Sequence, residues 1–395
     1  MNHTNQHFDA IIVGLGAMGS ASLYQLARRG MRVLGIDQFS PPHTKGSTHG
    51  ETRVTRLAIG EGTSYVPLVI RSHELWREIE QATGESLLTQ NGGLIIGKRH
   101  VDSRQHGVDN FLLSTIAAAE QFDIDHDTLE ARDVRRRFPQ FTIDDDESAY
   151  FEPAAGFVRP EKCVAAQLSL AKEQGAEIWL ETIVDQFDVV GKSKVTVDTA
   201  TRGRVTAEQL VLTSGAWIGN FLPSHLSQWF KVYAQVQYWF RPQVKSHFDA
   251  SQFPIFICVT EHDHDMIYGF PMLDSTADAI KVAAERYDTT ISADDEPTPV
   301  SEAIVMAMKR RVTDRIKGLT GEITRMQSCL YTCTNDFGFV IDHHPEYDNV
   351  LLVSPCSGHG FKHSAAIGEA AAELITQGSS RLDLHPFRLK RLQDE

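Results

Sequence analysis

The N-terminal part of the chain has the clearest pattern of hydrophobic and polar positions. Residues 8–13 form a largely apolar run, which predicts a buried strand. Residues 17–29 repeat apolar side chains at helical spacing, and Gly30 ends the predicted helix. A second strand-like run over residues 32–36 closes on Asp37. The order of strand, glycine-rich turn, helix and strand predicts one βαβ unit with two parallel strands.

Two later segments show the same change from a strand-like run to a glycine-rich turn. Residues 209–213 and residues 349–353 are the two runs, and we expect both to return to the first sheet. Between them the pattern changes, because residues 229–240 and 253–260 alternate as strands of an antiparallel sheet do. The chain therefore predicts two different sheets.

This order predicts a mixed α/β (α+β) fold with two domains. A chain of 395 residues exceeds the size at which a single core usually keeps growing. We expect a Rossmann-like nucleotide-binding domain assembled from residues 1–90, 152–225 and 326–395. We expect residues 91–151 and 226–325 to form a substrate-binding and catalytic domain, with helices and a mixed, largely antiparallel sheet.

Charge and composition exclude several classes of partner. The 38 basic and 52 acidic side chains give a net charge of −14, which repels nucleic acid and anionic membranes. No apolar run is long enough to span a bilayer, and the polar start lacks the apolar stretch of a secretory signal. Five irregularly spaced cysteines fit a reducing compartment better than a disulfide framework. We expect a soluble, cytoplasmic protein that binds neither membrane nor nucleic acid.

The first predicted turn has the spacing of a dinucleotide site. Gly14 permits the tight turn, Gly16 lets a pyrophosphate approach backbone N–H groups, and Gly19 lets helix and strand pack closely. Asp37, at the end of the next strand, can accept a hydrogen bond from a ribose hydroxyl. This context favours a bound nucleotide over an empty turn, but it leaves FAD and NAD both open.

The segment after the second strand is dense in hydrogen-bond donors. Residues 41–56 suit a surface loop equally well by composition, but loops at the carboxyl edge of such a sheet face the cofactor. This loop resembles that of the monomeric sarcosine oxidase and N-methyl-L-tryptophan oxidase family, FAD-dependent amine oxidases of the D-amino acid oxidase superfamily. The resemblance continues in order through residues 60–62, 65–68, 268–271, 329–332, 342–345 and 357–362.

The resemblance implies an FAD-dependent oxidase of a secondary (N-methyl) amino acid such as sarcosine or N-methyl-L-tryptophan. Its products would be an amine or amino acid, an aldehyde and hydrogen peroxide. It also implies a monomer with FAD joined covalently to Cys329. Two alternatives stay open: a dehydrogenase that passes electrons to a carrier instead of oxygen, and a nucleotide-binding protein without redox turnover.

The resemblance assigns residues to the flavin side of the site. His49, Thr52 and Arg53 would lie beside the flavin, and Lys281 would activate oxygen. The alternative for Lys281 is an exposed strand lysine. The alternative for Cys329 is an ordinary buried thiol, the commonest fate of a free cysteine.

The turn at residues 357–360 likewise has a functional interpretation and an ordinary structural one. Gly358 and Gly360 would bring the N–H groups at the start of a helix over residues 364–375 to the flavin, where reduction adds negative charge. An ordinary glycine-rich helix start is the alternative.

The resemblance also assigns residues to the substrate side. Arg56 and Lys362 would hold the substrate carboxylate, for which two cations are well suited, and Tyr268 and Tyr331 would flank the substrate. Half of a surface ion pair is the alternative for Arg56, and core aromatics are the alternative for the two tyrosines.

Two positions depart from the family, and one is Thr48, which stands where a second histidine usually precedes His49. Four residues after Lys281 a histidine is expected, and this chain has Glu285, which would favour a substrate with an extra donor or positive charge. Alternatively, Glu285 points to solvent or pairs with Arg286. Residues 261–265 and 343–344 have metal-ligand types without ligand spacing, so we expect no metal.

Overall fold

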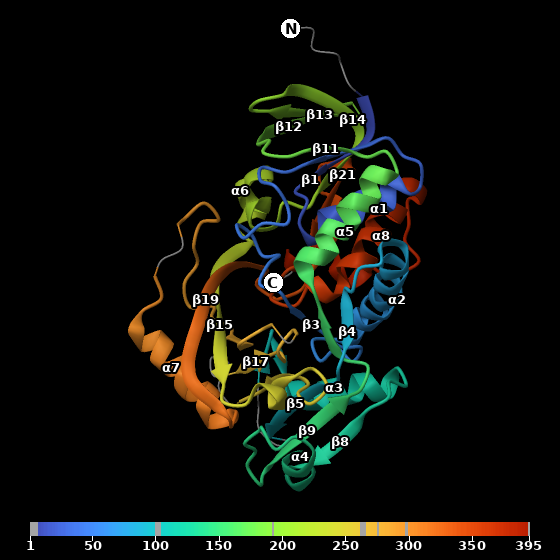
Figure 1. Ribbon diagram of the computed structural model, residues 1–395. Helices are drawn as coiled ribbons and strands as arrows, with labels where there is room; N and C mark the ends of the chain where they lie inside the picture. Colours follow the sequence, from blue (N-terminus) through green and yellow to red (C-terminus); the bar gives the residue numbers. More distant parts are fainter. Residues whose placement is uncertain are drawn as a thin grey trace.

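The computed structural model describes residues 7–98, 104–191, 193–260, 266–274, 276–296 and 299–393 (Figure 1). Within these residues two eight-stranded sheets dominate, one in the upper half of Figure 1 and one in the lower half. The mixed α/β fold predicted from the sequence is therefore confirmed.

The first sheet contains the predicted βαβ unit. Its parallel strands are β11 (Glu177–Trp179), β2 (Val33–Ile36), β1 (His7–Val13), β14 (Gly203–Leu212) and β21 (Tyr347–Ser354). Three antiparallel strands extend it, namely β12 (Val184–Val190), β13 (Lys194–Thr199) and β20 (Val340–His344). Both later strands return to the first sheet as predicted, because β14 pairs with β1 and β21 pairs with β14.

Helices cover this sheet on one side. They are α1 (Ala17–Ala27), α2 (Val66–Thr83), α5 (Pro160–Glu173) and α8 (Ser364–Gln377). Figure 1 shows α1 and α5 side by side, with α8 next to them. A Cβ atom on Gly368 of α8 would lie 2.4 Å from the Cβ of Ala21 on α1, so this crossing requires small side chains.

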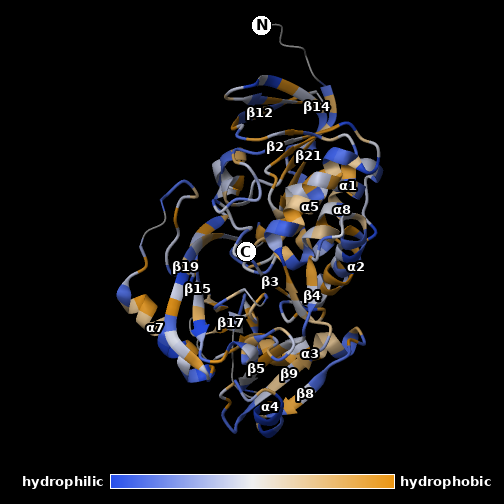
Figure 2. Ribbon diagram, viewed as in Figure 1, coloured by the Kyte–Doolittle hydropathy of each residue, from blue (hydrophilic) through white to orange (hydrophobic). Residues whose placement is uncertain are grey.

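The second sheet is mixed and largely antiparallel, as expected. Its order is β19 (Leu319–Cys333), β15 (Lys231–Pro242), β18 (Ile280–Ala284), β17 (Ile267–Gly269), β16 (Ile255–Cys258), β5 (Gly93–Lys98), β9 (Glu147–Glu152) and β8 (Asp127–Glu130). The β16–β5 pair is parallel and the other pairs are antiparallel. Around it lie α3 (Phe111–Gln121), α4 (Ala131–Arg137) and α7 (Glu302–Arg315). The hydropathy colouring places apolar residues along the strands of both sheets (Figure 2).

Two smaller sheets and several short helical turns complete the described elements. A three-stranded sheet joins β3 (Arg53–Thr55), β10 (Gly156–Val158) and β4 (Leu88–Gln90), and a hairpin joins β6 (Arg104–Gln105) to β7 (Val108–Asp109). The remaining turns of helix are η1 (Thr63–Tyr65), η2 (Gly215–Phe221), α6 (Ser224–Ser227), η3 (Lys245–Phe248), η4 (Phe361–His363), η5 (His385–Phe387) and η6 (Leu389–Leu392). The domain boundaries stay a prediction, and β19 runs across the boundary expected at residue 326.

Candidate active site

The turn between β1 and α1 has the geometry that a dinucleotide site requires. Gly14 has a φ of +90°, and a Cβ there would lie 2.7 Å from the Thr213 carbonyl oxygen. A Cβ on Gly19 would lie 1.7 Å from the Gly14 carbonyl oxygen, so only glycine fits where α1 crosses the turn. At Gly16 the nearest atom to such a Cβ is the Thr48 Oγ1 at 3.5 Å, which leaves room beside the helix N-terminus for a phosphate group.

Asp37 follows β2 at the wall of the same pocket. Its carboxylate accepts hydrogen bonds from the backbone N–H groups of Leu15, at 2.7 Å, and Phe39, at 2.8 Å. Burial raises the pKa of Asp37, and these two bonds and the nearby His43 oppose that rise. The carboxylate therefore fixes the glycine turn, and its contact with a ribose stays a prediction.

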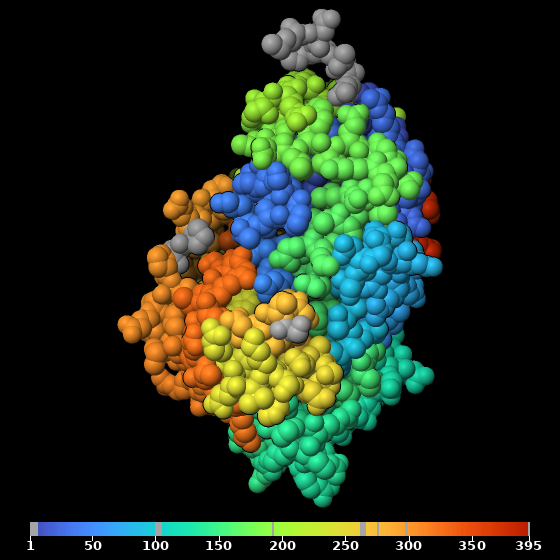
Figure 3. Space-filling model, viewed as in Figure 1, coloured from blue at the N-terminus to red at the C-terminus, as the bar shows by residue number. Residues whose placement is uncertain are grey.

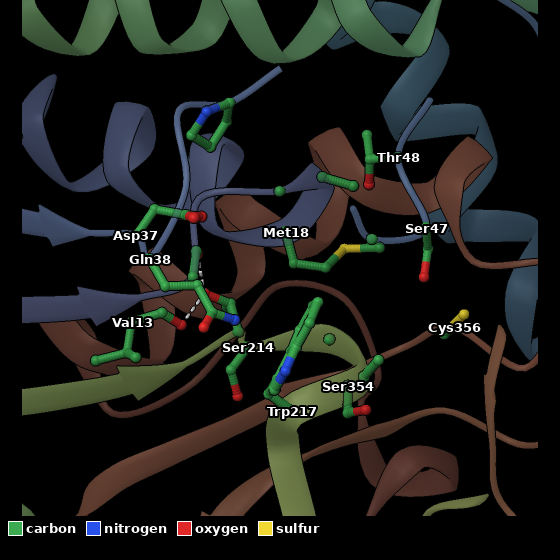
Figure 4. A pocket seen from close by; sticks show the side chains of 18 of the residues that line it. Val13, Met18, Asp37, Gln38, Ser47, Thr48, Ser214, Trp217, Ser354 and Cys356 are labelled. Atoms are coloured by element: carbon green, nitrogen blue, oxygen red, sulfur yellow. Dashed lines mark hydrogen bonds between the residues drawn. The ribbon is translucent and has the colours of Figure 1, made fainter. Parts of the chain in front are cut away.

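A long pocket runs beside this turn (Figure 4). Figure 4 shows Asp37 and Gln38 on one side of it and Ser47 and Cys356 on the other. Of the residues predicted from the sequence, those that line the pocket are Gly14, Gly16, Asp37, Arg53, Tyr331, Gly358 and Gly360. The pocket thus joins the predicted nucleotide turn to the predicted flavin end of the site.

The loop after β2 closes one wall of the pocket. Figure 3 shows this N-terminal segment, in blue, at the surface between the upper and lower parts of the molecule. Arg53 donates hydrogen bonds to the carbonyl oxygens of Ser47, at 2.6 Å, and Thr52, at 2.8 Å. His49 is buried with its Nδ1 atom 3.0 Å from the Gln327 amide, and burial, aided by Arg53, lowers its pKa to about 4. His49 is therefore uncharged at neutral pH.

Lys281 reaches the same loop from β18. Its ammonium group donates hydrogen bonds to the carbonyl oxygens of Gly50, at 2.7 Å, and Thr52, at 2.6 Å, and lies 4.3 Å from the centre of the Phe270 ring. The residue is 4% exposed, so the alternative of an exposed strand lysine is wrong. Burial lowers the pKa of Lys281 well below its ordinary value, and the neighbouring Arg53 adds to this.

Cys329 lies on β19, two residues before the pocket-lining Tyr331. It is buried, which raises the pKa of its thiol, whereas Arg53 and Gln237 act to lower it. Both polar atoms of the Gln237 amide are buried without a hydrogen-bond partner among the described residues. Cys356, a second thiol, lines the pocket directly.

The glycine turn at residues 357–360 also lines the pocket, through Gly358 and Gly360. Gly358 has a φ of +79°, and a Cβ on Gly360 would lie 1.5 Å from the Pro355 carbonyl oxygen. The N–H groups of His359 and Gly360 both donate to the Cys356 carbonyl oxygen at 2.9 Å. Helix α8 begins at Ser364, after η4, so donation from this turn to a flavin stays a prediction.

The two predicted tyrosines meet. The hydroxyl groups of Tyr268 and Tyr331 lie 2.9 Å apart, and burial raises the pKa of both phenols. Because the hydroxyl groups satisfy each other, both rings can stand in a buried apolar site without an unpaired polar group.

Arg56 and Lys362 both lie beside the carboxylate of Glu61, a residue to which the sequence assigned no role. Arg56 donates to Glu61 Oε2 at 2.7 Å, and Lys362 Nζ lies 3.9 Å from Glu61 Oε1. All three side chains are at most 4% exposed, so a surface ion pair is the wrong interpretation of Arg56. Burial lowers the pKa of Lys362 to about 8, and Arg56 and Lys362 keep the pKa of Glu61 well below its ordinary value.

Glu285 faces this group. It accepts hydrogen bonds from Tyr287, at 2.9 Å, and Gln105, at 3.1 Å, and lies 2.8 Å from His106 Nε2. Arg286 pairs with Asp288 at the surface, so the alternatives of solvent exposure and an Arg286 partner are both wrong. His106 was missed from the sequence, where the only signal was Gly107 after it, a residue that suits the second position of a tight hairpin turn.

The structure describes one of the two clusters of metal-ligand residue types. The segment 261–265 lies outside the described residues, and His344 ends β20 with its Nδ1 accepting from the Glu346 N–H. Within the described residues, no group of three or more metal-ligating side chains could hold an ion, and no helix could cross a membrane.

Comparisons with known proteins show the family of the chain. The family described as FAD dependent oxidoreductase matches residues 9–374. Monomeric sarcosine oxidase of Bacillus sp. (strain B-0618) is 36% identical over 98% of this chain and 96% of its own length. That of Streptomyces avermitilis is 37% identical over 98% of both chains. N-methyl-L-tryptophan oxidase of Yersinia pestis (strain Pestoides F) is 32% identical over 98% of this chain and 100% of its own.

Solved structures share the fold at lower identity. NikD, an unusual amino acid oxidase essential for nikkomycin biosynthesis, has a TM-score of 0.83 at 20% identity over 97% of both chains. L-proline dehydrogenase from P. horikoshii has a TM-score of 0.80 at 21% identity over 98% of both chains. Together with the glycine turn and its pocket, which fit FAD, the sequence matches show that this chain is an FAD-dependent oxidoreductase and belongs to the family of monomeric sarcosine oxidase and N-methyl-L-tryptophan oxidase.

Proposed function

We propose that this enzyme oxidises a secondary (N-methyl) amino acid with oxygen as the acceptor. The observation that carries the proposal is the pair of buried cations, Arg56 and Lys362, around one carboxylate. Desolvated cations that converge on one point suit a carboxylate ligand, and Arg56 can offer two parallel donors. The names of the relatives support sarcosine or N-methyl-L-tryptophan as the substrate class.

The residues of the chain would divide the work as follows. Arg56 and Lys362 bind the substrate carboxylate, and Tyr268 and Tyr331 flank the substrate and exclude water. FAD, when bound, would supply the acceptor for a hydride equivalent from the carbon next to nitrogen, with oxygen as the final electron acceptor. Neutral His49 and cationic Arg53 hold the loop beside the flavin end of the pocket. The imine product hydrolyses in water to an amine and an aldehyde.

Release of peroxide from N-methyl amino acids and cyclic imino acids tests this proposal. We expect sarcosine or another N-methyl amino acid to give hydrogen peroxide and formaldehyde, with one oxygen consumed for each substrate. Substrate-dependent reduction without oxygen uptake would instead support the dehydrogenase alternative, with a carrier or quinone as acceptor. A purified protein without flavin colour would contradict both.

We further propose that FAD is attached covalently through Cys329, and Cys329→Ser is expected to retain at most noncovalent FAD. The parent protein should remain yellow after denaturation, and its intact mass should include one flavin. Cys356→Ser is the matched control, because this second thiol lines the pocket and its loss should leave the attachment intact. Release of all flavin from the parent by acid precipitation would contradict the attachment.

We also propose a monomer in the cytoplasm, with the two domains divided as predicted from the sequence. The names of the sarcosine oxidase relatives support the monomer. All five cysteines are free thiols, which suits a reducing compartment.

A further inference from the structure

The β6–β7 hairpin brings a histidine into the proposed substrate site. His106 and Gly107 form the turn, with φ angles of 47° and 79°. Two consecutive residues with positive φ suit a tight two-residue hairpin turn, for which Asn-Gly is the preferred pair. The His106 side chain is nevertheless only 5% exposed, because its ring points into the protein although Gly107 beside it is exposed. A Cβ on the pocket-lining Gly358 would lie 2.8 Å from His106 Nε2, so the imidazole stands directly behind the pocket wall.

His106 bridges two buried carboxylates. Its Nδ1 lies 3.3 Å from Glu61 Oε1, and its Nε2 lies 2.8 Å from Glu285 Oε2. Each ring nitrogen therefore faces a carboxylate oxygen, and Nε2 also lies 3.4 Å from the Gln105 amide nitrogen. The doubly protonated, cationic ring can donate to both carboxylates. The two carboxylates raise the pKa of His106 to about 9 against the effect of burial. The ring also contacts His359, with the ring centres 5.1 Å apart.

The charges of this cluster sum to one positive charge. Among the side chains that these contacts join, three are cations (Arg56, Lys362 and His106) and two are anions (Glu61 and Glu285). Glu152, another buried carboxyl near Arg56, accepts from the Leu57 and Ala58 N–H groups and the Tyr150 hydroxyl; burial raises its pKa, and it lies outside this cluster. An amino acid that reacts with its amine uncharged and its side chain neutral brings one negative charge, which balances the cluster. A charged side chain would leave an uncompensated charge of either sign in a buried site, which is costly.

We propose that His106 is a specificity-determining residue that neutralises Glu285 and restricts the site to amino acids with one carboxylate and an uncharged side chain. This inference rests on the proposed binding of the substrate carboxylate by Arg56 and Lys362. It replaces the expectation that Glu285 by itself favours a cationic substrate, because His106 already supplies that cation. The family resemblance predicts a histidine at position 285. In this chain the imidazole of His106, from the β6–β7 hairpin, lies beside Glu285 instead.

The test compares small carboxylates that differ only in charge at the far end. Calorimetry on the purified holoenzyme measures the affinities for pentanoate, 5-aminopentanoate and pentanedioate, without any need for turnover. The parent should bind pentanoate about tenfold or more tightly than the other two. His106→Asn removes the cation and leaves an Asn-Gly turn, which favours the same hairpin. In that variant the preference should reverse towards 5-aminopentanoate by about tenfold.

A second substitution separates charge from structural damage. In the double variant of His106→Asn with Glu285→Gln, the cluster again carries one positive charge, and the preference for pentanoate should return. An unchanged ratio of affinities in His106→Asn would overturn the inference, as would a double variant that keeps the reversed preference. If the parent binds none of the three carboxylates, the carboxylate site of the proposed function is wrong, and this inference is wrong with it.

Discussion

Lys281→Met is expected to slow reoxidation of the reduced enzyme by oxygen about 100- to 1,000-fold, while anaerobic reduction by substrate falls much less. Oxygen is neutral and its first reduction product, superoxide, is an anion, so this step creates a negative charge that substrate oxidation does not. An ammonium group 4 Å away, at an effective dielectric constant of 20, would stabilise that charge by about 4 kcal/mol, which corresponds to roughly a thousandfold in rate.

The contacts of Lys281 suit this role. Two carbonyl oxygens, of Gly50 and Thr52, and the face of Phe270 hold its ammonium group at the loop beside the pocket. Because burial lowers the pKa of Lys281, its charge is lost at a lower pH than that of an exposed lysine. The reoxidation rate of the parent should therefore decrease as pH rises through that lowered pKa, and Lys281→Met should remove this dependence.

Stopped-flow measurement of the two half-reactions decides the role of Lys281. Lys231→Met is a suitable control, because Lys231 is an exposed lysine on β15, the strand that pairs with β18. Parent-like reoxidation by the Lys281→Met enzyme would remove Lys281 from oxygen activation. An equal slowing of both half-reactions would indicate structural damage and not a role in the oxygen step.

Local patterns were enough to predict the nucleotide half of the fold. Gly14 and Gly19 follow a short strand and open a helix, and the tight contacts at both positions explain why glycine is needed there. The strands β14 and β21 were found because each is an apolar run followed by a glycine-rich turn. The contact at Gly19 is with a near neighbour in the sequence, whereas Gly14 meets Thr213 and the strands pair across the chain, so the pattern indicated these elements without showing their contacts.

The substrate side could not be predicted from local patterns. β18 is buried along its whole length. Its sequence therefore lacks a regular alternation of apolar and polar residues, and this left open whether Lys281 is exposed. Glu61 lay within a motif that carried the family resemblance, yet its pairing with Lys362 joins distant parts of the chain. His106 and Glu285 are 179 residues apart, and the hairpin that places His106 has strands of two residues each, too short for a periodic signal.

The largest loss of substrate binding is expected from Arg56→Ala and Lys362→Ala. Removal of one partner from a desolvated charge contact costs about 2 to 5 kcal/mol, or roughly 30-fold to several thousandfold in affinity. Titration of each variant with a simple carboxylate inhibitor, followed by steady-state kinetics with the substrate, measures this loss. Arg204→Ala is the control, because Arg204 forms an exposed pair with Asp198 whose loss should change affinity less than twofold.

Glu61 complicates the Arg56 measurement, because Arg56→Ala leaves its buried carboxylate with fewer partners. The double variant of Arg56→Ala with Glu61→Gln removes that unpaired charge. If it binds the inhibitor as weakly as Arg56→Ala does, the loss reflects the missing contact between Arg56 and the ligand. If it recovers the affinity of the parent, the loss came from the unpaired Glu61 and Arg56 does not bind the ligand.

The pH dependence of inhibitor binding gives an independent test of Lys362. Its pKa of about 8 lies below the ordinary lysine value because of burial, so in the parent the cation is present at pH 7 and lost as pH rises. Inhibitor affinity should therefore decrease above about pH 8, and a bound carboxylate, which favours the cation, should shift this decrease to higher pH. Lys362→Ala should remove the decrease, since the titrating group is absent. If both single variants bind the inhibitor as the parent does, and Lys362→Ala keeps the same pH profile, the two cations do not hold the substrate carboxylate.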